Sequence, residues 1–202
     1  MAAKQRKAFG LTVLDARHPK VRKLRRDGHV AEIHGNKIWD SSFLVMDHLK
    51  RHPLPKRTRV LDIGCGWGLL GLFCAKRFGN RVHGIDADRN VLPYLELHAE
   101  VNGVRMTAER KTFKKLTVDY LSNFDVVMGA DICFWDDMTG ELYNLIKRAR
   151  RAGVKQVIVA DPQRSPFTAL AVRCEKKFKK VERIKKSIKR PVEAHGELLI
   201  VR

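Results

Sequence analysis

From residue 57 onward the chain alternates short apolar runs with longer amphipathic stretches. Five apolar runs predict strands, the last two apolar enough for burial on both faces: 58–63, 81–86, 104–109, 124–130 and 155–161. Helices are predicted at 69–78, 89–102, 136–151 and 165–177, and two further strands near 179–188 and 195–201. Strand–helix alternation with such short joints predicts a mostly parallel, twisted sheet with helices on both faces.

The pattern before residue 57 is less regular. Gly35 and Asn36 interrupt it ahead of "KIWDSSFLVMDHLK", which predicts a turn followed by an amphipathic helix. We therefore predict a basic N-terminal extension over 1–34 and a single domain over 35–202. With 202 residues in all, a separate substrate domain does not fit in the remaining length.

The stretch "RVLDIGCGWGLLG", residues 59–71, carries the first candidate chemistry. A predicted strand leads into glycines at every second position, Gly64, Gly66 and Gly68, so the backbone there can approach a ligand closely. A dinucleotide fingerprint requires its third glycine at position 69, which is leucine. Asp62 before the glycines repels a pyrophosphate but attracts the amino group of a methionine-like ligand, which favours S-adenosylmethionine over NAD.

The second predicted strand ends at Asp86, where a carboxylate can accept hydrogen bonds from both hydroxyls of a ribose. Together with the glycine turn and the strand–helix order, this acid predicts a cofactor site. The predicted cofactor contacts are Asp62, Gly64, Cys65, Gly66, Gly68, Asp86 and Ala87.

Three segments, "VLDIGCGWG", "GID" and "FDVVMGAD", resemble the successive motifs of the class I, seven-β-strand methyltransferases over residues 57–202. The resemblance implies a Rossmann-like fold with an antiparallel last strand and S-adenosylmethionine as cofactor. More narrowly, "KIWDSSFLVMDHL" and "GAD" resemble methyltransferase family 16, whose members are mostly protein lysine methyltransferases. That likeness implies that Trp39 and Ala130 join the cofactor site. The family's Asp-x-x-Tyr motif stands here as Asp131-x-x-Phe134, which lacks the phenol hydroxyl.

Methyl transfer to a lysine requires the nucleophile to be aligned, deprotonated and kept from water. Asp131, after the fourth predicted strand, is placed to orient the ammonium group, and Phe134 and Trp135 to wall a channel around an aliphatic stem. We assign the catalytic positions to Asp131 and Phe134. The structural alternatives are that Asp131 caps the next helix and that the aromatic residues belong to the core.

Four functions remain open: a protein N-methyltransferase, an RNA methyltransferase, a small-molecule methyltransferase, and an inactive binding module of the same fold. The loop "ADICFWDD" lacks the proline–aromatic pattern used on base amines, and Cys133 has no basic neighbour to activate it. Lysine methylation leads, with rRNA or tRNA methylation as the main alternative. The intact glycine motif argues against the inactive module.

The formal net charge of +19 is concentrated in two segments. Residues 1–26 carry nine Lys or Arg and one acid, and residues 173–190 carry ten and two. These segments indicate either contact with RNA or a ribosome, or only a solvated surface. Scattered cysteines and histidines predict no metal site, and the absence of a long apolar segment predicts a cytoplasmic protein with no membrane contact.

Overall fold

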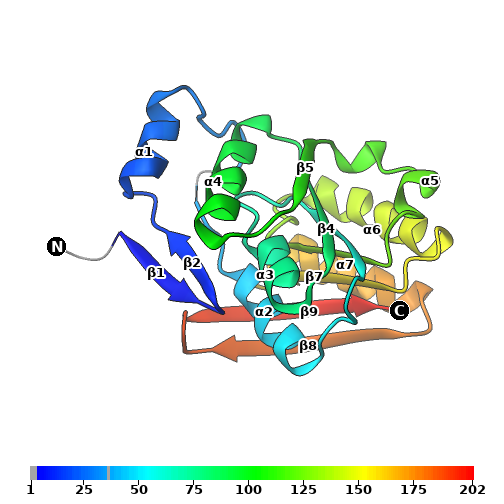
Figure 1. The fold of residues 1–202 in the computed structure, drawn as a ribbon. Coiled ribbons are helices and arrows are strands. Elements are labelled where there is room, and N and C mark those ends of the chain that lie inside the picture. The colour runs from blue at the N-terminus through cyan, green and yellow to red at the C-terminus, as the bar shows by residue number, and fades with distance from the viewer. Residues whose placement is uncertain (1–3, 36) are drawn as a thin grey trace.

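The computed structural model describes residues 4–35 and 37–202. Its main sheet has seven strands in the order β5-β4-β3-β6-β7-β9-β8 (Figure 1). The strands are β3 (Arg59–Ile63), β4 (Arg81–Asp86), β5 (Thr107–Arg110), β6 (Val126–Ala130), β7 (Gln156–Asp161), β8 (Val181–Ile188) and β9 (Ala194–Val201). The five strands from β5 to β7 in this order pair in parallel, whereas β9 is antiparallel to both β7 and β8. The predicted fold class, including the antiparallel last strand, is confirmed.

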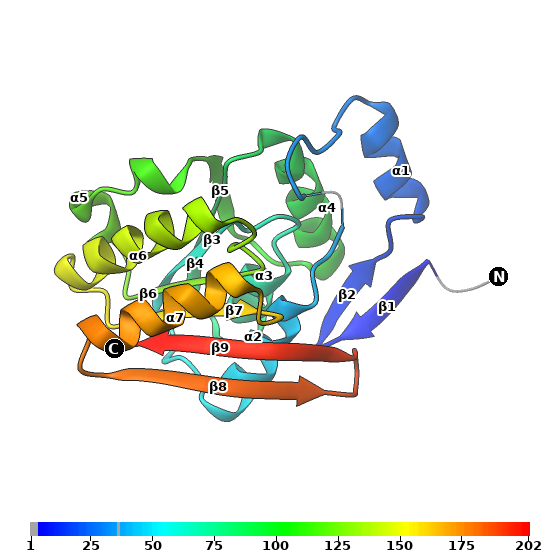
Figure 2. The same cartoon turned by 180° about the vertical axis from the view of Figure 1, so that it is seen from behind.

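Helices cover both faces of the sheet. One face carries α2 (Ser41–Arg51), α3 (Leu69–Phe78) and α4 (Leu92–Asn102), and the other carries α5 (Val118–Leu121), α6 (Asp136–Arg151) and α7 (Ser165–Lys177), which stand in front in Figure 2. Two clusters of buried side chains correspond to these faces, one containing Phe43 and Phe73, the other Phe167 and Leu142. Because both faces are covered, β6 and β7 are almost uninterrupted apolar sequences.

Most predicted boundaries agree with the structure to within two residues. The helices α3, α6 and α7 have the predicted bounds. The predicted strand at 104–109 begins later, at Thr107, and the predicted helix at 89–102 begins with the short 3-10 helix η1 (Arg89–Val91). Gly79 and Gly103 end α3 and α4 in the left-handed conformation. Among the described residues, no helix combines the length and apolarity needed to cross a bilayer.

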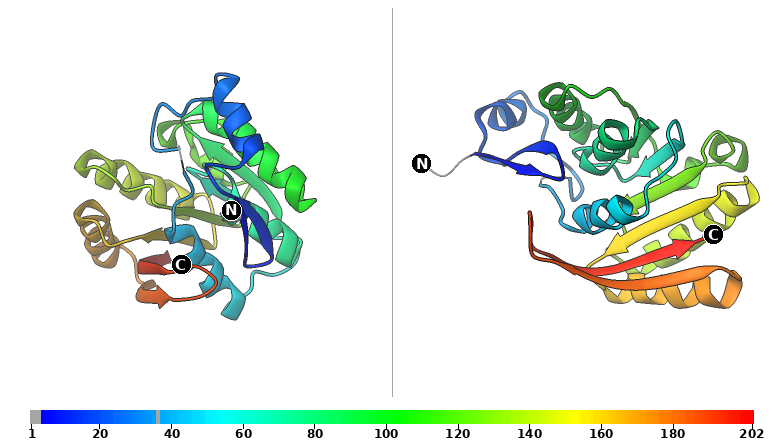
Figure 3. Two further views of the ribbon diagram at one scale, coloured as in Figure 1. Left: turned by 90° about the vertical axis from the view of Figure 1, so that its left-hand side faces the viewer. Right: turned by 60° about the horizontal axis from the view of Figure 1, so that its bottom comes forward.

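The N-terminal segment holds elements that the sequence pattern did not predict. β1 (Gln5–Ala8) and β2 (Leu11–Leu14) form an antiparallel hairpin, followed by α1 (Pro19–Arg26), and Figure 3 shows α1 beside α4 in both views. Two side chains of α4 hold β2: Asn102 accepts from the backbone N–H of Thr12 at 2.7 Å, and His98 accepts from that of Leu14 at 3.2 Å. The hairpin of the predicted 1–34 extension is therefore packed into the same core as the rest of the chain.

Candidate functional site

The glycine turn joins β3 to α3 at the carboxyl edge of the sheet. Gly64, Gly66 and Gly68 have φ angles of 63°, 51° and 77°, a region that side chains rarely adopt. A Cβ atom on Gly64 would stand 2.5 Å from Ile132, and one on Gly68 would stand 2.5 Å from Leu95. Gly66 faces open space, so the backbone of this turn is bare on the side where a ligand can approach.

Asp86 lies beside this turn at the end of β4. Its carboxylate accepts hydrogen bonds from the backbone N–H groups of Gly66 at 2.9 Å and Asp88 at 3.0 Å. Burial raises the pKa of Asp86, while these hydrogen bonds oppose the shift. Asp86 and Ala87 line a cavity of about 350 Å³ that also touches Gly64 and Gly66. A carboxylate beside a glycine turn is the arrangement that the sequence analysis expected at a ribose site.

Asp62 lies behind the turn and is almost fully buried. It accepts from the backbone N–H of Gly71 at 2.9 Å, and burial raises its pKa to about 7. With Cys65 it lines a smaller cavity of about 50 Å³, whose wall shares Trp39, Gly64, Gly66 and Ala130 with the larger one. Burial also raises the pKa of the Cys65 thiol well above its usual range. Gly68, also predicted as a cofactor contact, lines neither cavity; it is the N-cap residue of α3.

The loop before α2 crosses the cavity and is fastened by three side chains. Asp88 accepts from the backbone N–H groups of Glu32 at 2.6 Å and Ile33 at 3.2 Å. The indole of Trp67 donates to the Gly35 carbonyl at 2.8 Å, and that of Trp39 donates to the His34 carbonyl at 2.7 Å. Ile33, His34 and Gly35 consequently line the cavity beside Trp39. His34 was not predicted from the sequence, because nothing in its local pattern distinguishes it from an exposed loop residue.

Asp131 follows β6 and is buried in the cavity wall, with a positive φ of 55°. Its Oδ2 accepts from the backbone N–H of Ser41, at the start of α2, at 3.0 Å. Its Oδ1 accepts from the guanidinium of Arg164 at 3.1 Å, and the same group donates to Asp161 at 2.7 Å. Asp131 therefore fixes the loop of Trp39 to the end of β6, in addition to facing the cavity. The alternative that it caps the helix after β6 is wrong, since the helix that it contacts is α2.

Four ring systems from distant parts of the chain surround the outer part of the cavity. Phe134 stacks on His34 with ring centroids 4.2 Å apart, and Trp135 tilts over His34 at 5.0 Å. Trp39 meets the ring of Phe134 at 5.2 Å, nearly edge to face. The guanidinium of Arg164 lies over the ring of Phe134, 4.4 Å from its centroid. We call His34, Trp39, Phe134 and Trp135 the aromatic mouth.

Carboxylates gather around the aromatic mouth, although the protein as a whole is strongly basic. Glu141 of α6 lines the cavity together with Asp131. Asp136 and Asp137 form the exposed first turn of α6, directly after Trp135. Cations lie here as well, since Lys114 lines the cavity and Lys37 Nζ lies 4.1 Å from the centroid of the Trp39 ring. The mouth therefore offers ring surfaces together with carboxylates that can attract a cationic group. Across residues 4–35 and 37–202, no three His, Cys, Asp or Glu side chains are grouped as metal ligands.

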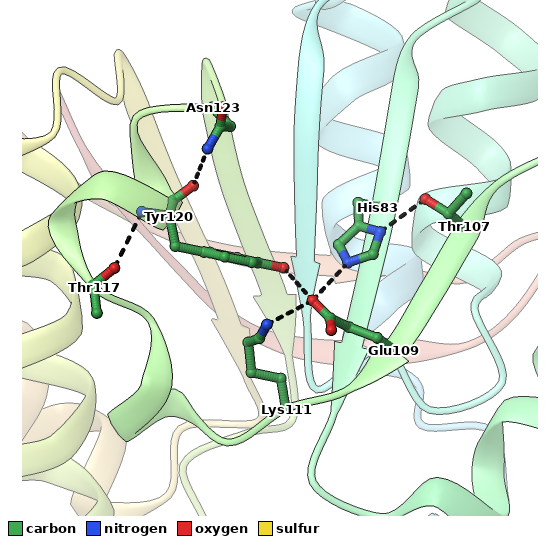
Figure 4. Close-up of polar contacts among 7 residues, drawn as sticks. All are labelled: His83, Thr107, Glu109, Lys111, Thr117, Tyr120 and Asn123. Atoms are coloured by element: carbon green, nitrogen blue, oxygen red, sulfur yellow. Dashed lines mark hydrogen bonds and ion pairs between the residues drawn. The ribbon is translucent and has the colours of Figure 1, made fainter.

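The opposite wall of the cavity comes from the loop after β5, which contributes Thr112, Phe113 and Lys114. Glu109 braces this loop by accepting from Lys111 Nζ at 2.7 Å and from the Tyr120 hydroxyl at 2.9 Å (Figure 4). His83 of β4 adds a third contact to the same carboxylate at 3.3 Å. These partners lower the pKa of Glu109. This wall was not predicted from the sequence, because its residue types carry no motif.

The chain matches known proteins over its central part, from the start of β3 to the end of α6. A family model described as a methyltransferase domain matches residues 60–153. A ubiquinone biosynthesis O-methyltransferase of Hahella chejuensis is 40% identical over 78 residues, 39% of this chain and 32% of the relative. One from Nitrosococcus oceani is 28% identical over 95 residues, 47% of this chain and 40% of the relative. The matched region thus spans about a third to two fifths of these curated relatives.

Solved structures share the fold at low sequence identity. A methyltransferase from Pyrococcus furiosus superimposes with a TM-score of 0.61 at 18% identity, covering 78% of this chain and 81% of the other. The Pyrococcus abyssi tRNA (uracil-54, C5)-methyltransferase, solved with S-adenosyl-L-homocysteine, gives 0.57 at 21% identity, covering 78% and 38%. Both share the Rossmann-like fold that the motifs predicted. None of these likenesses is to methyltransferase family 16, so that narrower resemblance stays a prediction.

Proposed function

We propose that this protein methylates an amine nitrogen of another protein, most of all that of a lysine side chain. The proposal starts from the class I, S-adenosylmethionine-dependent methyltransferase domain that the chain contains. The observation that supports this acceptor is the aromatic mouth with its surrounding carboxylates. Rings accommodate an aliphatic stem and attract a cation, and carboxylates favour the approach of an ammonium group.

The residues around the cavity fit the cofactor. Asp86 would hold the ribose, the turn at Gly64 and Gly66 would lie along the methionine portion, and Asp62 would face its amino group. When bound, the cofactor supplies an electrophilic methyl group. The remaining requirements are to align the acceptor, to exclude water and to accept the proton that the ammonium loses.

The acceptor side is where this chain's residues perform these tasks. Trp39 and Phe134 shield the inner cavity from solvent and confine the aliphatic stem. Asp131 is oriented by Ser41 and Arg164, so its carboxylate is fixed at the cavity wall. Glu141 offers a second carboxylate at the mouth, from which the proton can pass to water. In this proposal Asp131 and Glu141 orient the ammonium. Phe134, whose faces are covered by His34 and Arg164, contacts the stem through its edge and holds this wall in place.

A second candidate is an aromatic hydroxyl on a small molecule. It is favoured by the relatives, which are named as ubiquinone biosynthesis O-methyltransferases. The family model, however, matches residues 60–153, whereas His34, Trp39 and Arg164 of the acceptor side lie outside that region. Asp131, Phe134 and Glu141 lie inside the matched region, so the likeness includes part of the acceptor side and leaves the hydroxyl candidate open.

The acceptor class is tested by incubating the protein with tritiated S-adenosylmethionine and a fractionated cell lysate. We expect the label to precipitate with protein and to be released by protease. Label that partitions into organic solvent supports the hydroxyl candidate instead, and label released by nuclease supports RNA methylation. An Asp86→Ala variant is the matched control, since it removes the proposed ribose contact and leaves the acceptor side intact.

A further inference from the structure

The edge of the sheet opposite the site carries a basic residue at almost every strand. Arg59 and Arg81 are the first residues of β3 and β4. Lys155 and Lys180 immediately precede β7 and β8, and Arg202 immediately follows β9, which runs the other way. Arg105 stands two residues before β5. We call these six residues the basic row, and all six are exposed.

The backbone shows that members of the basic row are neighbours. The N–H of Arg81 donates to the Thr58 carbonyl at 3.0 Å, and that of Arg202 donates to the Lys180 carbonyl at 2.9 Å. Asp125, which precedes β6, links Arg59 to Lys155. Its N–H donates to the Arg59 carbonyl, and its own carbonyl accepts from the N–H of Lys155, both at 2.8 Å. Seven strands about 4.8 Å apart make the row about 29 Å long.

Helix ends add further charge along this edge. The last turns of α3, α6 and α7 stop here, and their exposed basic residues, with those of the following connection, are Lys76, Arg77, Arg151, Lys176, Lys177 and Lys179. Cations at helix C-termini stabilise the helix dipole, which accounts for these residues locally. That reason does not apply to the basic row, whose members stand at strand ends.

Two acids partly balance the row without reversing its charge. Asp125 forms ion pairs with Arg59 at 3.0 Å and Lys155 at 3.4 Å, and Glu182 pairs with Arg202. Hydrogen bonds from Arg59 hold the pKa of Asp125 well below its usual range. The ion pairs fix Arg59 and Lys155 in place, and the edge as a whole remains strongly positive.

A groove of about 750 Å³ opens at one end of the row. Arg59, Arg81 and Arg105 line it, together with Asn123 and Phe124. His83 also lines the groove and stacks on Phe124, with ring centroids 6.2 Å apart and planes at 22°. Glu96 and Asn80 line it as well, so the groove combines three guanidinium groups and one carboxylate with ring surfaces and two side-chain amides. Proteins that bind single-stranded nucleic acids use this combination, because phosphates need cations and bases stack on rings.

We propose that the basic row and this groove form a docking surface for single-stranded RNA, separate from the methyl-transfer site. In Figure 1 the C-terminus and the ends of α6 and α7 lie at the right, whereas β1, β2 and α1 lie at the left. An RNA held on this edge therefore leaves the mouth at the carboxyl edge open to its acceptor. The basic residues of the N-terminal segment do not line the groove, although Lys20 of α1 pairs with Glu100 of α4 at 3.0 Å.

A negatively charged membrane is the competing partner, and the surface chemistry disfavours it. Helices and loops that insert into a bilayer pair basic residues with exposed apolar ones. The large apolar side chains that are exposed in the described part of the chain lie outside the row and the groove: Val30, Ile33, Val118, Trp135 and Val172. A bilayer could form only electrostatic contacts with this surface, whereas RNA could form electrostatic contacts through its phosphates and also stack its bases on the rings.

The test compares two charge-matched double variants. Arg81→Glu with Arg105→Glu reverses the groove, and Arg22→Glu with Arg26→Glu makes the same charge change on exposed positions of α1. Binding of a fluorescein-labelled single-stranded RNA is followed by anisotropy over a potassium chloride series. We expect the groove variant to lose at least about tenfold in affinity and to show a shallower salt slope, since each lost phosphate contact reduces the slope by about 0.7. The α1 variant is expected to stay within about threefold of the wild type.

Equal losses in both variants would overturn the proposal, because binding would then depend on net charge alone. No loss in either variant would also overturn it, because the RNA would then not bind at the groove. Vesicles of phosphatidylcholine and phosphatidylserine form a separate arm, and binding that only the groove variant loses there, with RNA binding unchanged, would identify a membrane instead. Calorimetry with S-adenosylmethionine checks that each variant is folded. If the groove variant is not folded, Lys155→Glu with Lys180→Glu tests the other half of the row with the same expected outcome.

Discussion

The imidazole of His34 stacks on the ring of Phe134, with centroids 4.2 Å apart and planes at 29°. One residue precedes α2 and the other follows β6, so two segments about a hundred residues apart in sequence close over one cavity. The same two segments are also joined deeper in the wall, where the backbone N–H of Ser41 donates a hydrogen bond to the Asp131 carboxylate. The acceptor side of the site is therefore built by the N-terminal segment and the β6 loop together.

The first prediction concerns the face of Phe134. Phe134→Ala removes the ring on which His34 and Arg164 rest, and we expect kcat/KM for the acceptor to fall at least about tenfold, because the acceptor is no longer positioned. Phe134→Tyr keeps the ring and is expected to retain activity within about threefold. If the tyrosine variant loses as much as the alanine variant, the ring face is not what the site uses.

The second prediction concerns cofactor affinity. Asp86→Ala removes the proposed acceptor of the ribose hydrogen bonds, each worth about 1.5–3 kcal/mol when one partner is charged, so S-adenosylmethionine should bind at least about tenfold more weakly. Titration calorimetry measures the change. Asp119→Ala, an exposed acid in the first turn of α5, is the control and should bind like the wild type. Unchanged binding by the Asp86 variant would remove this residue from the site.

The third prediction is a pH dependence set by Asp62. Burial raises its pKa from 3.8 to about 7, so the folded protein holds a proton between these values that the unfolded chain does not. The free energy of unfolding should therefore decrease as the pH rises from about 4 to 7. A cofactor ammonium favours the ionised carboxylate, so the affinity should weaken as the pH falls below about 7. In Asp62→Asn, neither the free energy of unfolding, measured by denaturation, nor the cofactor affinity, measured by calorimetry, should change in this way between about pH 5.5 and 7.

The fourth prediction separates transfer from cofactor binding. Asp131→Asn keeps an oxygen for the Ser41 N–H but loses the negative charge that faces the acceptor and Arg164. We expect kcat to fall at least about a hundredfold, because the ammonium is no longer oriented toward the methyl group, while cofactor affinity changes less than about threefold. Thermal denaturation monitors the weakened pair with Arg164. A variant that transfers methyl groups at the wild-type rate would leave Asp131 with a structural role alone.

The gathering of Gly64, Gly66 and Asp86 at one edge of the sheet could be predicted from sequence because its determinants are local. Gly64, Gly66 and Gly68 lie within one turn, and their backbone angles leave few other residue types. Asp86 lies at the end of the next strand, and parallel pairing brings it to the same edge. The Rossmann-like fold follows from the same alternation of strands and helices.

The acceptor half could not be predicted in the same way. His34 and Arg164 acquire their roles only when the loop before α2 and the loop after β7 meet the end of β6. The hairpin β1–β2 was missed because its stability comes from Asn102 and His98, about ninety residues away. The basic row could not be predicted from the distribution of charge along the sequence for a similar reason. Its six residues are dispersed along the chain, and only the strand order aligns them.

The most direct test of lysine methylation is to identify the group that receives the methyl. Protein labelled from tritiated S-adenosylmethionine in a lysate is hydrolysed completely in acid, and the amino acids are separated by chromatography. We predict that the label elutes with N-methylated lysine and that the Asp131→Asn enzyme produces little of it. Label that stays in a solvent-extractable hydroxyl compound, with none in lysine, would contradict the proposed function.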